Sequence, residues 1–319
     1  MQTLAQLPRA NSADRTQYLG ASECAAVLGL DPYRTPFGVW AGKQADAPAL
    51  DDSTVLQRGR FLERGVIEWC AHELGASDIE AGVALGQPGI VGPAPWLAVR
   101  PDGVLHFEGG ASMLVEAKTS DAEGFVVEGR EDVPEHYAVQ CLMQLACVPV
   151  ERVVVPAYLP IRRRFVRPVV ERDDALIVEL LERLDAWWYA HCDPHGPLTA
   201  PPLDASEASA TWVKRSFPRE SAGMRAATED EARLVSEWAA TKALLDETQS
   251  ATNALKHALQ AAIGDHEGLT IDGGKVTWKA QAGANRLDAK LLRERFPEAA
   301  AACTVQGEPT RVLRSTLKG

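Results

Sequence analysis

The sequence lacks the features that mark metal-cluster, membrane or secreted proteins. None of its six cysteines forms a Cys-x-x-Cys pair, so we expect free thiols rather than a zinc or iron–sulfur cluster. It has no uninterrupted run of about 18 apolar residues, which predicts no membrane-spanning helix. The first residues show no basic stretch followed by an apolar core, so no secretory signal is expected. These absences favour a cytoplasmic protein.

The chain also lacks an excess of positive charge. Its 319 residues carry 33 Lys and Arg against 44 Asp and Glu, a net charge of −11. Residues 1–202 hold 17 basic and 28 acidic residues, whereas residues 203–319 hold 16 of each, so all the acidic excess lies in the first part. This balance excludes a uniformly basic nucleic-acid binder. A local basic patch stays possible, because electrostatic screening confines such patches to about 10 Å.

Apolar periodicity and turn residues divide the chain into two parts. Residues 1–202 alternate helical and strand-like segments, which predicts an α/β domain with a mixed sheet flanked by helices. Ser22 is the expected N-cap of the first helix. The expected helices are 22–30, 35–44, 54–75, 134–148 and 171–192, and the expected strands are 82–86, 96–100, 102–107, 112–118, 152–160 and 162–170. A Pro-rich polar stretch at 195–209 then indicates a linker.

Residues 203–319 are predicted to form a helical extension with a small β-hairpin. Thr228 and Glu231 form a capping-box sequence. From Leu234 to Ala262, apolar residues and threonines recur at alternating spacings of four and three, which is typical of a coiled-coil seam. Either this helix packs on its own chain or it pairs with another subunit. The hairpin is expected at 268–281, around an Asp-Gly-Gly turn.

Charged residues occupy one end of an apolar hairpin predicted at residues 100–120. Asp102 opens its first strand, and Glu116 and Lys118 close the second. Alternate residues of a strand share a face, and a three-residue loop or a bulge near the Gly-Gly turn would pair Asp102 with Lys118. Two close carboxylates in an apolar setting repel each other unless a cation lies between them, and hard oxygen ligands suit Mg²⁺ or Mn²⁺. The alternative is a surface salt-bridge cluster worth at most about 1 kcal/mol.

The same residues resemble a known nuclease signature. The segments "RPDG" and "VEAK" match the two halves of the PD-(D/E)xK motif. "GRFLE" at 59–63 resembles the G-x-x-x-E of the YqaJ-like viral recombinases and the lambda-exonuclease-like family. Residues 134–148 resemble their Tyr-x-x-Gln-x-x-x-Met helix. Residues 15–40 resemble their N-terminal block, with Ala-Ser-Glu where relatives often have Gly-Ser-Asp. The resemblance covers about residues 15–190.

The resemblance implies a fold and a catalytic centre. The fold would be a PD-(D/E)xK restriction-endonuclease-like core over residues 1–202. Asp102, Glu116 and the backbone carbonyl of Ala117 would bind one metal ion, and Glu63 would bind a second, so two Mg²⁺ or Mn²⁺ ions are expected. The expected catalytic set adds Lys118 and Gln140, which would position and activate the attacking water.

The resemblance also implies how DNA would be held. Arg15, Ser22 and Tyr137 are the expected ligands of the DNA 5′-phosphate end, and Arg15 lies seven residues before Ser22 as it does in the family. For Arg162, Arg163 and Arg164 two alternatives stay open, a contact with the DNA backbone and a solvated turn.

The implied activity is that of a metal-dependent phage-type recombination exonuclease. It would digest one strand of linear double-stranded DNA 5′→3′ and expose a 3′ single strand. The family further implies double-stranded DNA ends and a single-strand-annealing protein as partners, a homo-oligomer (a trimer), and a bacterial or phage-infected host cell. Two alternatives stay open: a structure- or sequence-dependent endonuclease on the same core, and a non-enzymatic DNA-end-binding scaffold. The complete Asp102, Glu116 and Lys118 set favours an enzyme.

Overall fold

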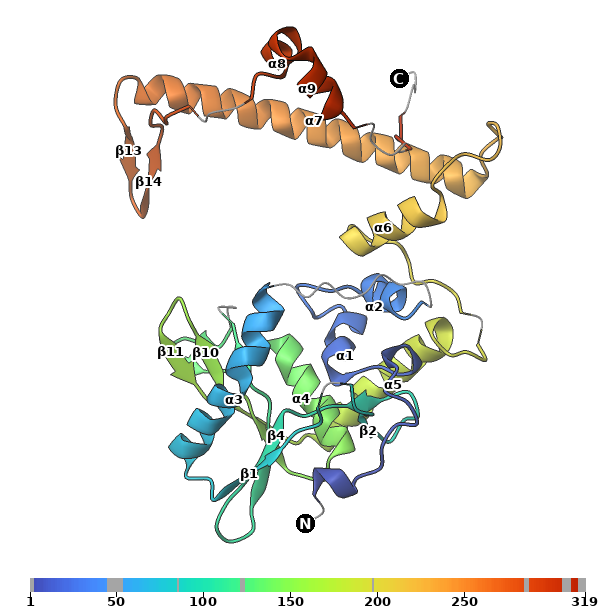
Figure 1. The fold of residues 1–319 in the computed structure, drawn as a ribbon, viewed down its shortest axis with the longest axis vertical. Coiled ribbons are helices and arrows are strands. Elements are labelled where there is room, and N and C mark those ends of the chain that lie inside the picture. The colour runs from blue at the N-terminus through green and yellow to red at the C-terminus, as the bar shows by residue number, and fades with distance from the viewer. Residues whose placement is uncertain are drawn as a thin grey trace. The chain divides into compact units, whose positions relative to one another are not determined.

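The chain forms two compact units, Met1–Ser216 and Phe217–Gly319, each described by itself (Figure 1). The computed structural model describes residues 3–44, 54–84, 86–120, 124–196, 198–283, 287–305 and 311–314. The predicted boundary at residue 202 precedes helix α6 (Glu207–Ser216), which belongs to the first unit. Trp212 of α6 packs on Phe37 and Trp40, with ring centroids 5.8 and 5.9 Å apart. These aromatic contacts place the boundary after Ser216.

A five-stranded mixed sheet forms the centre of the first unit. Its strand order is β1 (Asp78–Ala81), β4 (Gly103–His106), β5 (Ser112–Val115), β9 (Arg152–Val154) and β12 (Val169–Glu171). β5 and β9 run parallel, and the other neighbours are antiparallel. The expected mixed α/β fold is confirmed. The strand predicted at 82–86 is wrong for residues 82–84: the Gly82 and Val83 N–H groups donate to the Asp102 and Pro101 carbonyls at 3.1 and 3.0 Å, but β1 ends at Ala81.

A second sheet continues the first one beyond a bend. It contains β11 (Arg164–Val166), β10 (Ala157–Leu159) and β6 (Lys118–Thr119), in that order. The strands predicted at 152–160 and 162–170 are therefore each split in two. Pro156 and Pro168 lie at the two interruptions, and proline has no N–H for the ladder. Glu116 and Ala117 cross the same bend between β5 and β6, so the Glu-x-Lys segment sits where the sheet changes direction.

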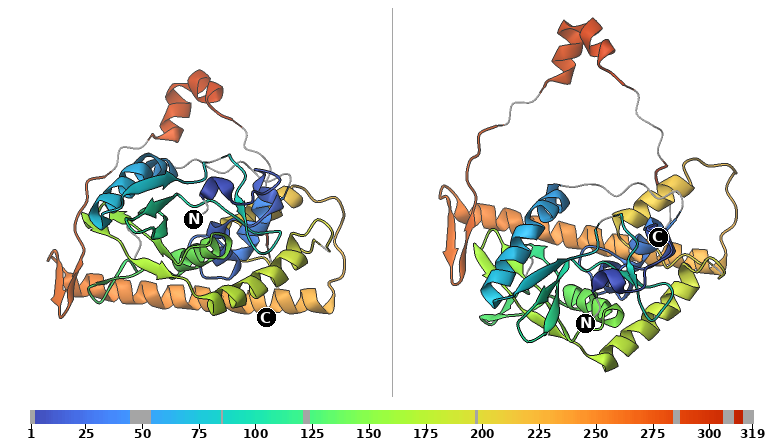
Figure 2. Two further views of the ribbon diagram at one scale, coloured as in Figure 1. Left: turned by 90° about the horizontal axis from the view of Figure 1, so that it is seen from below. Right: turned by 60° about the horizontal axis from the view of Figure 1, so that its bottom comes forward.

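The two faces of the central sheet carry different helices, because side chains alternate along each strand. Val104, Leu114 and Val153 belong to one hydrophobic core, which also contains residues of the helices α1 (Ala21–Val27), α4 (Glu135–Cys147) and α5 (Asp174–His191). Leu105, Val115 and Val154 belong to a smaller core with Ile67, Cys70 and Ala71 of helix α3 (Thr54–Leu74). The sheet thus lies between α3 on one side and α4 on the other (Figure 2).

The predicted helices of the first unit are confirmed within a few residues. They are α1 (Ala21–Val27), α2 (Pro36–Gly42), α3 (Thr54–Leu74), α4 (Glu135–Cys147) and α5 (Asp174–His191). The N-cap predicted at Ser22 is wrong, since Gly20 is the N-cap and Ser22 lies inside the first turn. Glu23 Oε2 accepts the Gly20 N–H at 2.8 Å, which satisfies the end of the helix.

Short elements complete the first unit. They are the 3₁₀ turns η1 (Leu4–Gln6) and η2 (Arg15–Gln17) and the two-residue strands β2 (Ile90–Val91), β3 (Ala98–Val99), β7 (Val126–Val127) and β8 (Arg130–Glu131). Within the described ranges, no helix is both long enough and apolar enough to cross a membrane.

The second unit is built on one long helix, α7 (Glu229–Ile263), capped at Thr228 as predicted. It also contains the predicted hairpin, β13 (Gly268–Ile271) and β14 (Gly274–Thr277), and the helices α8 (Ala289–Arg295) and α9 (Pro297–Ala302). The seam residues Leu234, Leu245 and Leu255 are 66%, 65% and 68% exposed. The described residues therefore leave this part of the seam uncovered, and pairing with another subunit stays a prediction.

The position of α6 leads to a prediction about truncated chains. A chain ending at Ser216 should be more stable than one ending at Pro202, because the shorter chain loses both Trp212 ring contacts. Two aromatic pairs together contribute about 1–3 kcal/mol to the free energy of unfolding. Urea denaturation of the two chains measures the difference. Equal midpoints would show that α6 does not stabilise the core.

Candidate active site

Asp102 and Glu116 meet at the bend of the sheet, in a register that differs from the prediction. The ladder pairs Gly103 with Val115, and Phe107 N–H donates to the Ala111 carbonyl, so the loop is 108–110. One further step along this register sets Asp102 opposite Glu116, whereas Lys118 was expected there. The loop has the predicted length of three residues but begins one residue earlier. The residue opposite Asp102 therefore changes by two positions, from Lys118 to Glu116, and both of these lie on the same face of the strand. Asp102 Oδ2 accepts the Ala117 N–H at 2.8 Å.

Glu116 is buried and both of its carboxylate oxygens accept hydrogen bonds. Lys118 Nζ and Gln140 Nε2 each donate to Oε1 at 2.6 Å. Gln144 Nε2 donates to Oε2, also at 2.6 Å. Gln140 also accepts from Lys118 Nζ at 3.3 Å. Burial alone would lower the pKa of Lys118, but the Glu116 and Asp102 carboxylates outweigh this effect and raise it, so the lysine is a fixed positive charge.

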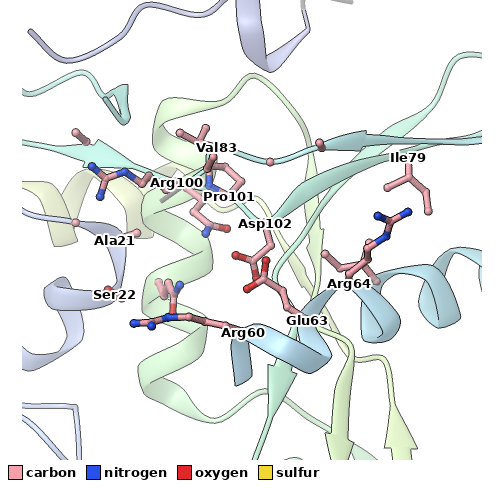
Figure 3. Close-up of a pocket in the computed structure, with 18 of the residues that line it drawn as sticks. Ala21, Ser22, Arg60, Glu63, Arg64, Ile79, Val83, Arg100, Pro101 and Asp102 are labelled. Atoms are coloured by element: carbon pink, nitrogen blue, oxygen red, sulfur yellow. The ribbon is translucent and has the colours of Figure 1, made fainter. Parts of the chain in front are cut away.

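A cavity of about 870 Å³ opens beside this cluster. Glu63, Asp102 and Gln140 line it, as do Arg15 and Ser22 from the N-terminal segment. Figure 3 shows the Glu63 and Asp102 carboxylates directed toward the same part of the cavity. Five of the predicted site residues therefore share one cavity, although they come from four separate segments of the chain.

The carboxylates of the cluster disfavour one another's charge. Burial, followed by the nearby Glu116 carboxylate, raises the pKa of Asp102 well above its ordinary value. The same two causes raise the pKa of Glu63. A cation between these groups would offset both effects. The arrangement is therefore prepared for a positive ligand.

The donor set fits a hard divalent cation by its chemistry. Carboxylate oxygens of Asp102, Glu116 and Glu63 are the ligand type that Mg²⁺ and Mn²⁺ prefer. In the described part of the chain, however, no three His, Cys, Asp or Glu side chains are grouped closely enough to form a metal site as they stand. Glu116 is instead hydrogen-bonded to Lys118 and two glutamines. Metal binding by these residues, and by the Ala117 carbonyl, stays a prediction.

Arg15 is held by an ion-pair network around the buried Lys43 that the sequence did not indicate. Lys43 Nζ donates to the carbonyls of Arg15 and Tyr18 at 2.8 Å each, and to Glu23 Oε2 at 2.6 Å. Arg15 Nη2 lies 3.4 Å from Glu23 Oε1. Burial alone would raise the pKa of Glu23, but Lys43 and Arg15 outweigh it and lower that pKa. Two cations share one carboxylate, so the network keeps a net positive charge next to the cavity.

The burial of this network predicts a large stability effect at Lys43. Its side chain is 4% exposed, and Lys43→Met would leave Glu23 buried without its main partner. We expect the free energy of unfolding to fall by about 3–5 kcal/mol, measured by urea denaturation. Adding Glu23→Gln to Lys43→Met removes the unpaired charge and should restore part of that loss. A loss below about 1 kcal/mol would mean that the pair behaves as a surface salt bridge.

The other predicted DNA-binding residues lie elsewhere. Tyr137 does not line the cavity, and its ring centroid lies 4.7 Å from Lys118 Nζ. Arg162, Arg163 and Arg164 are exposed at the turn between β10 and β11, outside the cavity lining. Their contacts with DNA stay predictions, and for Tyr137 the structure provides another role, a cation–π contact that restrains Lys118.

Two residues of the site were missed at the level of sequence. Arg60 lines the cavity one helical turn before Glu63, and Figure 3 shows it directed toward Ser22. Gln144 follows Gln140 by four residues on α4. In both cases the i, i+3 or i, i+4 spacing from a predicted site residue was the available signal, because it sets two side chains on one face of a helix.

Comparison with known proteins gives a family likeness for the segment that contains the site. Residues 12–150 match the family described as the YqaJ-like viral recombinase domain. This segment includes the cavity residues and the Asp102–Lys118 hairpin, and it is similar to YqaJ-like viral recombinase domains, as its motifs indicated. A curated relative is the "Uncharacterized protein YqaJ" of Bacillus subtilis (strain 168). It is 26% identical over 291 residues, which cover 89% of this chain and 87% of the relative.

Solved structures with some likeness include an alkaline exonuclease (LHK-Exo) from Laribacter hongkongensis. It has a TM-score of 0.42 and 24% identity, over 54% of this chain and 87% of that chain. A phage-related exonuclease from Haemophilus somnus 129PT has a TM-score of 0.36 and 14% identity, over 53% of this chain and 91% of that chain. At these low TM-scores the fold class rests on the topology of the chain itself.

Proposed function

We propose that this chain is a divalent-metal-dependent deoxyribonuclease that acts on the ends of linear duplex DNA. It would digest one strand 5′→3′ and leave a 3′ single strand for recombination. The main support is that one cavity is lined by acidic side chains suited to metal ions and by an arginine suited to a phosphate. The acidic half holds Glu63 and Asp102, with Glu116 behind them, and the basic half holds Arg15 beside Ser22.

Each half has a task in hydrolysis. Two Mg²⁺ ions, or Mn²⁺, would supply Lewis-acid stabilisation of the entering and leaving oxygens. Asp102, Glu116 and the Ala117 carbonyl would hold one ion, and Glu63 the other. Lys118 would offset negative charge that develops on the phosphate, and its contacts with Glu116 and Gln140 keep its ammonium in position.

The basic half would define the end of the DNA. Arg15 would hold the terminal 5′-phosphate beside Ser22, so that the first internal phosphodiester lies at the carboxylates. Water would attack the phosphorus of this phosphodiester, and the bond between phosphorus and the O3′ of the terminal nucleotide would break. The released nucleotide then carries a 3′-hydroxyl and the shortened strand carries a new 5′-phosphate, which the same pocket can bind in the next cycle.

A digest of labelled DNA tests the proposal. Linear duplex carrying a label near one 5′ end, a linear duplex with the label at the 3′ end, and closed circular duplex are each incubated with the protein and Mg²⁺. We expect release of the 5′-side label first, loss of activity in chelator, and no cleavage of the circle. Cleavage of the circle would favour the endonuclease alternative. Binding of ends without cleavage in Mg²⁺ or Mn²⁺ would favour the scaffold alternative.

The assembly and setting of this enzyme belong to the same proposal. A ring-like homo-oligomer, a trimer, would keep the enzyme on its DNA. A single-strand-annealing protein would take up the exposed 3′ strand, and the exposed α7 seam offers a surface for either kind of partner. A cytoplasmic setting in a bacterial or phage-infected cell is the one in which such DNA ends arise.

A further inference from the structure

Gln144 is a buried residue of the candidate active site that has no role in the proposed function. It lies on α4 four residues after Gln140, and its side chain is fully buried, with 0% exposure. Its Nε2 donates to Glu116 Oε2 at 2.6 Å, while Lys118 and Gln140 both bond to Oε1. The three bonds together fix the plane of the Glu116 carboxylate.

Gln144 differs from Gln140 in what else it contacts. Gln140 also accepts from Lys118 Nζ, so its orientation depends on the lysine. For Gln144 Oε1, by contrast, no donor is found among the described residues, although that atom is buried. Gln144 is also among the residues that line the cavity.

The orientation of the Gln144 amide is set by charge. Turning it over would place Oε1 against the Glu116 carboxylate, where two acceptors would repel each other. Glu116 therefore holds Nε2 toward itself and leaves Oε1 as an acceptor. A buried acceptor without a donor is costly, so this orientation is imposed by the Glu116 carboxylate.

An amide is suited to orienting a carboxylate that must bind a cation. A lysine or arginine at this position would add a second cation to the one that Lys118 already provides, whereas a glutamine fixes the direction of Glu116 without adding charge. Partners of this kind behind a metal-binding carboxylate orient it and affect metal affinity. The neighbouring Met143 and Leu145 are fully buried, so α4 is anchored at this point.

We propose that Gln144 is a positioning residue that orients Glu116 for binding a divalent cation. This inference rests on the proposed metal-dependent nuclease function. It adds a residue that acts through Glu116.

Substitution by methionine tests the proposal, because Gln144→Met keeps the length of the side chain and removes both hydrogen-bonding atoms. Mn²⁺ binding is measured by titration calorimetry on the full chain without DNA. We expect the affinity to fall about 10- to 100-fold. The Mg²⁺ concentration for half-maximal cleavage should rise by a similar factor, while the KM for DNA stays the same. Met143→Leu, a packing change one residue away, is the matched control and should alter neither quantity.

The possible outcomes separate the two proposals. Mn²⁺ affinity and Mg²⁺ dependence that are unchanged in a folded Gln144→Met protein would overturn the role of Gln144 and leave the nuclease intact. A wild-type chain that neither binds Mn²⁺ nor cleaves DNA would overturn the proposed function itself. Should the variant not fold, the wild-type chain provides the test by NMR: Mg²⁺ should shift the side-chain amide resonances of Gln144. Resonances that do not move at saturating Mg²⁺ would refute the inference.

Discussion

Asp102→Asn is expected to lower the rate of Mg²⁺-dependent DNA cleavage roughly a thousandfold or more. Metal ions supply several kcal/mol of transition-state stabilisation in such sites, and about 1.36 kcal/mol corresponds to a tenfold change in rate. Asparagine keeps an oxygen that can accept the Ala117 N–H, so the hairpin should stay folded. Initial rates on a labelled linear duplex measure the effect. Binding of the same duplex, followed by fluorescence anisotropy, should change little.

Glu68→Gln is the matched control for this prediction. Glu68 lines the same cavity, but its carboxylate pairs with Arg64 at 2.7 Å on the exposed side of α3. Its loss should change the rate by no more than a few-fold, since exposed pairs contribute little. Asp102→Asn with a near-normal rate, or a Glu68→Gln rate as low as that of Asp102→Asn, would refute the assignment of the cluster.

The register of the central hairpin shows what the sequence could decide about the fold. Side chains alternate along each strand of the hairpin. Asp102, Glu116 and Lys118 therefore share a face only if the loop between the two strands has an odd number of residues. This condition could not distinguish a loop at 108–110 from one at 109–111, since both satisfy the alternation and both include the two glycines. The long helices were predictable because apolar residues recur over several turns. The strands were overextended because Pro156 and Pro168 interrupt them where the sheet bends.

Some residues of the site could be predicted from short sequence motifs, whereas others are brought together only by tertiary packing. Glu63, Asp102 and Gln140 belong to short motifs, and the structure brings all three to one cavity. The partners that hold the N-terminal half could not be found in this way. Glu23 and Lys43 are 20 residues apart, one in helix α1 and the other at the C-cap of α2, and only the packing of those helices brings them together. A single buried lysine has no sequence pattern that separates it from an exposed one.

Arg15→Ala is expected to reduce digestion of 5′-phosphorylated ends far more than digestion of 5′-hydroxyl ends. Arg15 is not part of a loose arm, because it begins the turn η2 and its carbonyl accepts from the buried Lys43. The Arg15 side chain is 38% exposed, and Arg15 lines the cavity with Ser22. Helix α1 has only seven residues, and Glu23 accepts the N–H of its N-cap Gly20, so we expect phosphate recognition to come from the Arg15 and Ser22 side chains. An Arg fork binds two phosphate oxygens at once, which lysine does not reproduce.

The size of this effect follows from the charge-assisted bonds that Arg15 would make. Hydrogen bonds to charged groups contribute about 1.5–3 kcal/mol, so the ratio of the two initial rates should fall about 10- to 100-fold. Arg15→Lys should recover only part of the ratio. Arg64→Ala is the matched control, because Arg64 lines the same cavity at 89% exposure and would lower both rates equally. If Arg15→Ala also lowers both rates equally, Arg15 does not recognise the terminal phosphate, and the enzyme would not select its ends through this pocket.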